Sequence, residues 1–158
     1  RRESRGGTRG GASASSDLYK SQGGALAAKV GSIGESRTLG YQEHGTSGWF
    51  TIFIRGMLCN WMVSMGVVGA MISTSAGSKM AAMWMPVMLF FFMGFEHSIV
   101  NMFLFPFSMI MGGEFTISDY LIWNEIPTVL GNLVGGFLLV GLPLYWTHVR
   151  TSAERKLV

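Results

Sequence analysis

The chain has 158 residues, of which 49% are hydrophobic and 13% charged, and its formal net charge is +3. This length allows one domain, and the single cysteine, Cys59, excludes an internal disulfide framework and a cysteine-based zinc site. Between Arg55 and Arg150 the only Lys or Arg is Lys79. A folded basic face for nucleic acid is therefore not expected, and the concentrated apolar runs favour membrane spans.

The N-terminal third lacks a hydrophobic period. Residues 1–24 are rich in Gly, Ser and Arg, which predicts a disordered arm. Their Arg- and Ser-rich composition also has a weak likeness to an organellar transit peptide. Residues 25–48 contain few large apolar groups and several glycines, so a connecting loop is expected there, with at most a little helix over 25–30.

The first predicted membrane span covers residues 49–72. Trp49 lies where an interfacial anchor is expected. Asn60 lies inside this apolar run, and an amide in lipid needs a partner, so it should face other helices. Residues 73–79 form a polar turn after the span.

The second predicted span, residues 80–112, has a polar interruption at Glu96 and His97. A charged acid or base costs roughly 2.5–3.5 kcal/mol in the middle of a membrane helix, so these groups should face protein or a wet cavity. Pro86 and Gly94 permit local breaks. Two half-helices that meet at a polar midpoint are typical of transporter binding sites; the alternative is that Glu96 and His97 only pair with neighbouring helices.

The third predicted span covers residues 126–148, after a loop over 112–125. Gly131 and Gly135 form a GxxxG pair, which packing within one protein explains as well as dimerisation does. The basic tail, 149–158, places the C-terminus on the cytoplasmic side by the positive-inside rule. Three spans then put the basic N-terminal arm on the opposite side, which conflicts with that rule.

Several motifs, in order and spacing, resemble the formate/nitrite transporter family. They are Arg-Gly-Met-Leu-Cys-Asn-Trp-Met-Val at 55–63, Pro-Val at 86–87, Gly-Phe-Glu-His-Ser-Ile-Val-Asn-Met-Phe at 94–103, and Pro127 followed by Gly-Asn at 131–132, Gly-Gly at 135–136, Val-Gly at 140–141 and Tyr-Trp at 145–146. The resemblance covers residues 45–148 and corresponds to the family's last three membrane segments.

The resemblance implies an all-α membrane protein: half of a six-helix, aquaporin-like transporter bundle with two related halves. The complete protein would be a homopentamer with one pore per protomer. Family substrates are small monovalent anions such as formate and nitrite. The threonine of the family's other broken loop has no counterpart here, so we expect that the first half of the bundle is missing and that transport belongs to the full-length protein.

The resemblance also assigns residues to the pore. His97 corresponds to the family's central histidine, and Asn60 to the asparagine near it. The apolar constriction corresponds to Val63 and Phe90. The residues expected to be structural at the broken helix are Gly94, Glu96 and Asn101.

A buried histidine suits the handling of a weak acid, because its pKa of about 6.5 lies near physiological pH. We therefore expect pH-linked exchange of anions and protons through a membrane-embedded, multi-pass protein, in either a plasma membrane or a plastid envelope. No cofactor, metal or enzymatic chemistry is predicted. Two alternatives are a small non-transporting membrane subunit and a soft-metal route, the latter suggested by the 12 methionines.

Overall fold

The computed structural model describes residues 9–150, with side chains for residues 23–149, and this part is helical without strands. The elements are α1 (Arg9–Ser36), α2 (Leu39–Gln42), α3 (Gly45–Ile72), α4 (Ala76–Phe92) and α5 (Ser98–Ile110), followed by α6 (Ile117–Tyr120), η1 (Leu121–Glu125), α7 (Ile126–Gly136), η2 (Phe137–Gly141), α8 (Leu142–Tyr145) and η3 (Trp146–Arg150). The last six form one continuous helix, which we call the C-terminal helix. Its η turns have wider, π-type hydrogen bonding.

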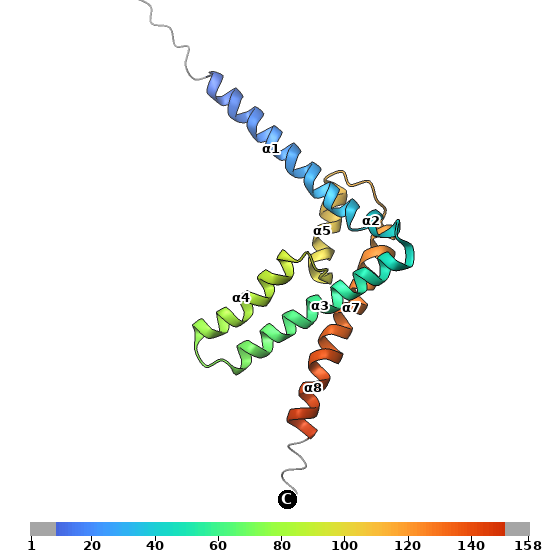
Figure 1. Cartoon of the computed structure of the whole chain (residues 1–158). Helices are drawn as coiled ribbons and strands as arrows, with labels where there is room; N and C mark the ends of the chain where they lie inside the picture. Colours follow the sequence, from blue (N-terminus) through green and yellow to red (C-terminus); the bar gives the residue numbers. More distant parts are fainter. Residues whose placement is uncertain (1–8, 151–158) are drawn as a thin grey trace, which may run out of the picture.

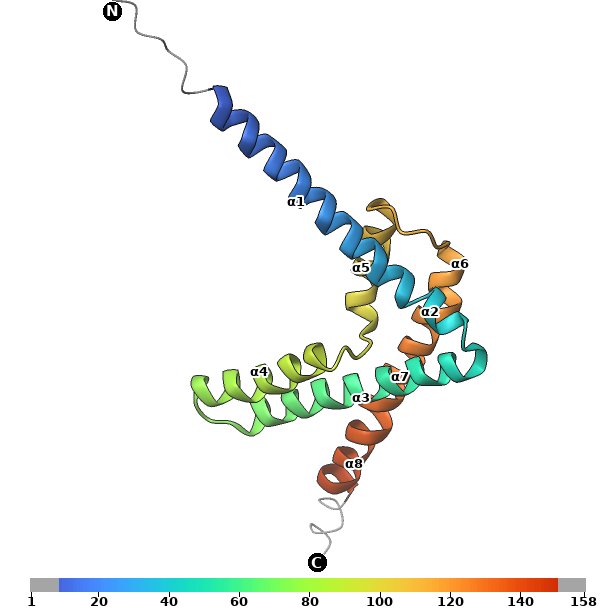
Figure 2. The same cartoon turned by 45° about the horizontal axis from the view of Figure 1, so that its top comes forward.

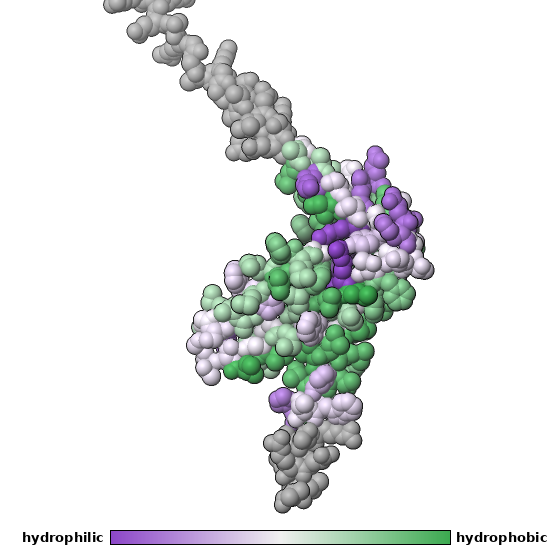
Figure 3. Space-filling view, viewed as in Figure 1, coloured by the Kyte–Doolittle hydropathy of each residue, from purple (hydrophilic) through white to green (hydrophobic). Residues whose placement is uncertain are grey.

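Helices α3 and α4 lie side by side as a hairpin, and α7 crosses α3 (Figures 1 and 2). Helix α1 points away from this body and meets it at its C-terminal end, where it contacts α5. Hydrophobic residues cover much of α3, α4 and the middle of the C-terminal helix, whereas the strongly hydrophilic residues gather near α2 (Figure 3). The polar groups are therefore concentrated where α1, α2, α5 and η1 come together.

The prediction for the N-terminal third was wrong over residues 9–24 and 31–36, because α1 is a helix where an arm and a loop were expected; the little helix allowed over 25–30 lies inside it. No proline interrupts this stretch, and two of its glycines, Gly31 and Gly34, lie in close contact with other segments. A Cβ added at Gly34 would overlap Ser108 Oγ, and the Ser108 hydroxyl donates to Val30 O at 3.1 Å. At Gly34, tertiary contact with α5 thus accompanies a residue of low helix propensity, whereas nothing lies within 4 Å of a Cβ at Gly23 or Gly24.

The predicted loop over 112–125 is also shorter than expected, because the C-terminal helix already begins at Ile117. Thr116 and Asp119 form a capping box there: Asp119 N donates to Thr116 Oγ1 at 3.1 Å, and Thr116 N donates to Asp119 Oδ2 at 2.9 Å. The third apolar stretch is correspondingly longer than the predicted 126–148.

Among residues 9–150, two helices are long and apolar enough to cross a membrane, Gly45–Ile72 and Ile117–Val149. Between them lie two shorter apolar helices, α4 and α5. Residues 93–97 separate these two and contain Glu96 and His97. The predictions for residues 1–8 and 151–158, the start of the arm and most of the basic tail, fall outside the described residues.

The GxxxG pair packs α7 against α3 within the chain. A Cβ at Gly131 would overlap the carbonyl oxygen of Phe53, and one at Gly135 would overlap that of Met57. Both obstacles are backbone atoms, which cannot rotate away. The sequence left open whether the GxxxG pair serves packing within one protein or dimerisation. In this structure it packs two helices of the same chain.

We predict that Gly135→Ala lowers the free energy of unfolding by about 1–3 kcal/mol, because the added methyl group forces α3 and α7 apart. Thermal unfolding in detergent measures this change. Gly77→Ala is the matched control, because nothing lies within 4 Å of a Cβ at Gly77; it should be neutral or stabilising. Equal melting temperatures for the two variants would contradict the packing described above.

Candidate functional site

Residues 93–97, which we call the break, interrupt the helices with a defined backbone path. Gly94 has φ +64°, in the left-handed region that glycine tolerates best. The N–H of Phe95 donates to Phe90 O at 3.0 Å, which closes the end of α4. His97 is the extended residue immediately before α5. The positive end of a helix dipole therefore faces the break from α5, whereas α4 presents its negative end.

Glu96 is completely buried and lies in a cluster of polar side chains from separate elements. The Asn101 amide donates to Glu96 Oε2 at 3.0 Å and to Asn124 Oδ1 at 2.7 Å. Arg37 Nη1 lies 3.6 Å from the same Glu96 oxygen. Asn124 in turn donates to the carbonyl oxygen of Arg37 at 2.9 Å. This cluster joins the break, α5, η1 and the residue that follows α1, and all of its contacts to the acid are made through Oε2. The other oxygen, Glu96 Oε1, is buried without a hydrogen-bond partner among the described residues.

A second buried acid, Glu125, lies next to Asn124 in η1 and is 6% exposed. The Ser98 hydroxyl donates to Glu125 Oε1, and the Tyr120 hydroxyl donates to Oε2 at 2.8 Å. Pro127 lies two residues further along and has no N–H to offer. The wide turn of η1 is therefore the kind of local adjustment that a proline imposes on a helix.

Asn132 ties the break to α3. Its amide donates to Gly56 O and to Glu96 O, both at 3.1 Å, and its Oδ1 lies 3.5 Å from Ser98 N. The amide of Asn60 donates to Asn132 O at 2.6 Å. Asn60 therefore faces another helix, as its amide requires, and its link to the break runs through Asn132.

His97 lines a cavity of about 230 Å³. Arg37 and Phe90 line it as well. The Phe90 ring is 4% exposed and its centroid lies 5.8 Å from that of the imidazole. His97 Nδ1 is buried and has no hydrogen-bond partner among the described residues. Val63 is half-buried on α3 and is not among the residues that line this cavity.

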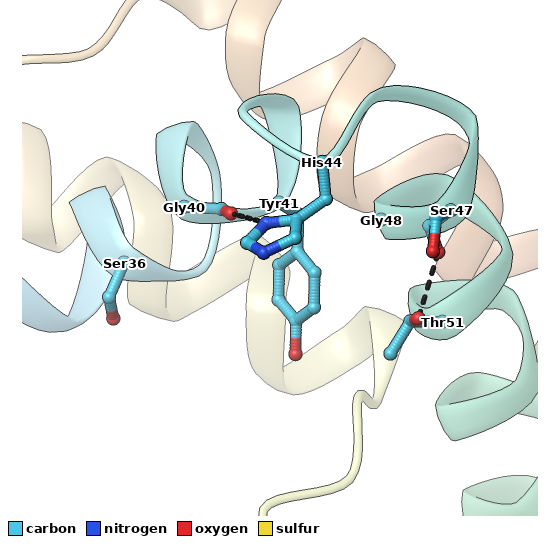
Figure 4. A pocket seen from close by; sticks show the side chains of 7 residues that line it. All are labelled: Ser36, Gly40, Tyr41, His44, Ser47, Gly48 and Thr51. Atoms are coloured by element: carbon cyan, nitrogen blue, oxygen red, sulfur yellow. Dashed lines mark hydrogen bonds between the residues drawn. The ribbon is translucent and has the colours of Figure 1, made fainter.

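A second cavity, of about 250 Å³, lies where α2 meets α3. Figure 4 shows the rings of His44 and Tyr41 between Ser36 and Thr51. The polar hydrogens here are already used locally: His44 Nδ1 lies 2.9 Å from Gly40 O, and the Thr51 hydroxyl donates to Ser47 O at 2.8 Å. This leaves few donors for an anion, so the cavity at His97 is the better candidate site.

Sequence reasoning did not identify four residues that hold the break: Arg37, Asn124, Glu125 and Asn132. The first three lay in segments that were predicted to be loops. Asn124 and Glu125 nevertheless precede a long apolar run directly. Two adjacent polar residues directly before an apolar run were the sequence feature that could have indicated Asn124 and Glu125.

Residues 11–146 match the family model described as formate/nitrite transporter. The chain belongs to this family. The predicted resemblance is therefore confirmed, and the match extends further toward the N-terminus than the motifs at 45–148 indicated, so it includes α1. Formate/nitrite transporters are integral membrane proteins and not enzymes.

The relatives include a probable formate transporter of Methanothermobacter thermautotrophicus, 37% identical over 131 residues, covering 83% of this chain and 44% of the relative. Formate-nitrite transporter 2 of Toxoplasma gondii is 39% identical over 94 residues, 60% of this chain and 20% of that protein. Among solved structures, a pentameric formate channel with formate bound superposes with a TM-score of 0.67 at 27% identity, covering 84% of this chain and 56% of that one. The chain thus spans less than half the length of these curated relatives.

We predict that Arg37→Met lowers the free energy of unfolding by about 1–3 kcal/mol, because it leaves the Glu96 charge buried without its cation. The double variant Arg37→Met/Glu96→Gln should recover part of this loss, since it removes both charges. Denaturation of the purified protein in detergent measures both effects. Lys29→Met, at an exposed position on α1, is the control. If the Arg37 variant is as stable as the Lys29 variant, the ion pair between Arg37 and Glu96 contributes nothing to the free energy of unfolding.

Proposed function

We propose that this chain forms the C-terminal half of a formate/nitrite transporter bundle. Its membrane segments would be α3, the pair α4–α5 and the C-terminal helix. With 17 and 13 residues, α4 and α5 are each shorter than the roughly 20 residues that span a bilayer, which supports their assignment to one broken segment. The complete protein would be a homopentamer with one pore per protomer, as the similarity to a pentameric formate channel suggests.

We further propose that the complete protein transports a small monovalent anion, formate or nitrite, together with protons. The observation that carries this proposal is His97: its imidazole lines the cavity at the break, its Nδ1 is buried without a partner among the described residues, and Arg37 lines the same cavity. A free ring nitrogen beside a cation and the positive end of α5 is suited to an anion.

Dehydration of the anion is the main barrier in an apolar pore. A carboxylate loses hydration worth many kcal/mol on entering a medium of low dielectric, and a neutral acid loses far less. Protonated His97 would offer the anion a hydrogen bond or a proton at the midpoint. Phe90, beside the imidazole, and Val63 would exclude water and cations, while Asn60 would act through Asn132.

The remaining residues of the break would hold its shape. Gly94 supplies the left-handed backbone, and Glu96 and Asn101 connect the break to the surrounding helices through side-chain hydrogen bonds. Because Glu96 is fully buried and paired with Arg37, we assign it a structural role and not a contact with the anion.

We predict that His97→Phe abolishes the pH dependence of formate and nitrite uptake and lowers uptake at acidic pH by about tenfold or more. The reason is the loss of one charge-assisted hydrogen bond, worth about 1.5–3 kcal/mol. Proteoliposomes containing the product of the complete gene, assayed from about pH 5 to 8, measure this change.

His44→Phe is the matched control, because His44 is an exposed histidine outside the break. It should keep the uptake and its pH profile. Unchanged uptake by His97→Phe would remove His97 from the mechanism. Absence of flux in the unmodified protein, combined with stable binding to a different membrane protein, would favour the non-transporting subunit instead.

A further inference from the structure

The side chain of Arg37 has no hydrogen-bond partner among residues 23–149. The acid paired with it, Glu96, has its Oε2 atom 3.6 Å from Nη1, which is an ion-pair contact and longer than a hydrogen bond. The backbone of Arg37 is satisfied, because its N–H donates to Ile33 O and its carbonyl oxygen accepts from Asn124. A guanidinium has five N–H donors. These donors stay without an acceptor in the described chain, although only 28% of the side chain is exposed.

The cavity at the break is where these donors can act. Arg37 and His97 both line it, and every other lining residue is apolar or a glycine. Arg37 comes from the segment that follows α1, whereas His97 belongs to the break. His97 Nδ1 is buried and lacks a partner among the described residues. The two residues with polar side chains at this cavity therefore come from distant parts of the sequence, and both have nitrogen atoms that no described residue occupies.

A ligand that uses both residues must be small and must accept hydrogen bonds at more than one atom. The cavity measures about 230 Å³, and a water molecule occupies about 30 Å³ in the liquid, so an anion of a few atoms fits there together with some water. The negative charge of Glu96 beside Arg37 opposes part of the attraction for any anion. The arrangement of the donors therefore matters more for the choice of anion than the net charge does.

We propose that Arg37 is a specificity-determining residue of the anion site: its guanidinium holds the two oxygen atoms of a planar anion, formate or nitrite, beside His97. This inference rests on the proposed function. A guanidinium is planar and presents two parallel N–H groups that match the two oxygens of a carboxylate. Nitrite is bent and has the same pair of oxygens. Azide has the same charge and a similar size, but it is linear and cannot place two acceptor atoms against the two N–H groups.

The test is Arg37→Lys in the product of the complete gene. Lysine keeps a cation beside Glu96, but it is a point charge without the two parallel donors. Uptake of labelled formate into proteoliposomes, in competition with unlabelled nitrite or azide, gives an inhibition constant for each competitor. Nitrite should compete better than azide in the unmodified protein. In Arg37→Lys this preference should fall about tenfold, as expected for the loss of one charge-assisted hydrogen bond.

Binding is measured separately from transport. Saturation-transfer NMR on the formate proton detects weak binding to the protein in detergent, and displacement of formate by nitrite or azide gives the same preference without any flux. The preference measured by displacement should fall by the same factor in Arg37→Lys.

Arg55→Lys is the matched control. Arg55 donates to the Tyr41 hydroxyl and is not among the residues that line the cavity at His97, so this variant should keep the preference of the unmodified protein. If Arg37→Lys does not fold, Arg37→Met/Glu96→Gln is the second variant. It removes the guanidinium together with the charge that the guanidinium balances, and the preference for nitrite should fall by a similar factor.

The two readouts separate the possible failures. A protein that transports no formate, but whose binding preference for nitrite is lost in Arg37→Lys, would overturn the proposed function and support the role of Arg37. An unchanged preference in a variant with pH-dependent formate uptake would overturn the role of Arg37 alone. Weaker uptake with an unchanged preference would overturn it as well, because Arg37 would then only balance the charge of Glu96.

Discussion

A carboxylate without water needs hydrogen bonds and a compensating charge, and this requirement organises the structure around Glu96. The acid is fully buried, and its partners come from the C-terminal end of α1, from α5 and from η1. These elements are far apart in the sequence. Their convergence on one oxygen atom positions the break, and with it the imidazole of His97.

The ion pair between Arg37 and Glu96 gives α1 a structural role that the composition of this helix does not suggest. The helix is weakly hydrophobic and rich in glycine, yet Gly34 allows it to approach Ser108 on α5 closely enough to bring Arg37 to the break. The family match, which begins at residue 11, includes this helix. The cation that balances Glu96 is therefore part of the family domain and not of an appended arm.

Two kinds of polar group meet at the break. Asparagine amides at 101, 124 and 132 connect backbone and side chains around the break without changing its charge. Ionisable groups at 37, 96 and 125 set its electrostatic potential. In our proposed function the first set holds the residues on either side of the histidine in place.

The sequence alone determined the family, the apolar segments around residues 49–72 and 126–148, and the polar stretch at 94–101, because hydrophobic runs and local motifs are properties of neighbouring residues. It did not reveal that residues 9–36 are helical or that the C-terminal helix begins at Ile117. Glycine-rich composition suggests a loop, and the close approach of Gly34 to Ser108 on α5 could not be seen in the sequence.

The partners of the candidate site were decided by the tertiary structure. Arg37 and Glu96 are 59 positions apart (96 − 37), and the contact between Asn124 and Arg37 spans 87. No local pattern encodes such distances, since they depend on how α1 and the C-terminal helix pack against α5. The sequence therefore identified the histidine as a candidate, and the fold identified the polar and charged residues around it. The partners of a buried charge are its neighbours in the folded structure, and these need not be its neighbours along the chain.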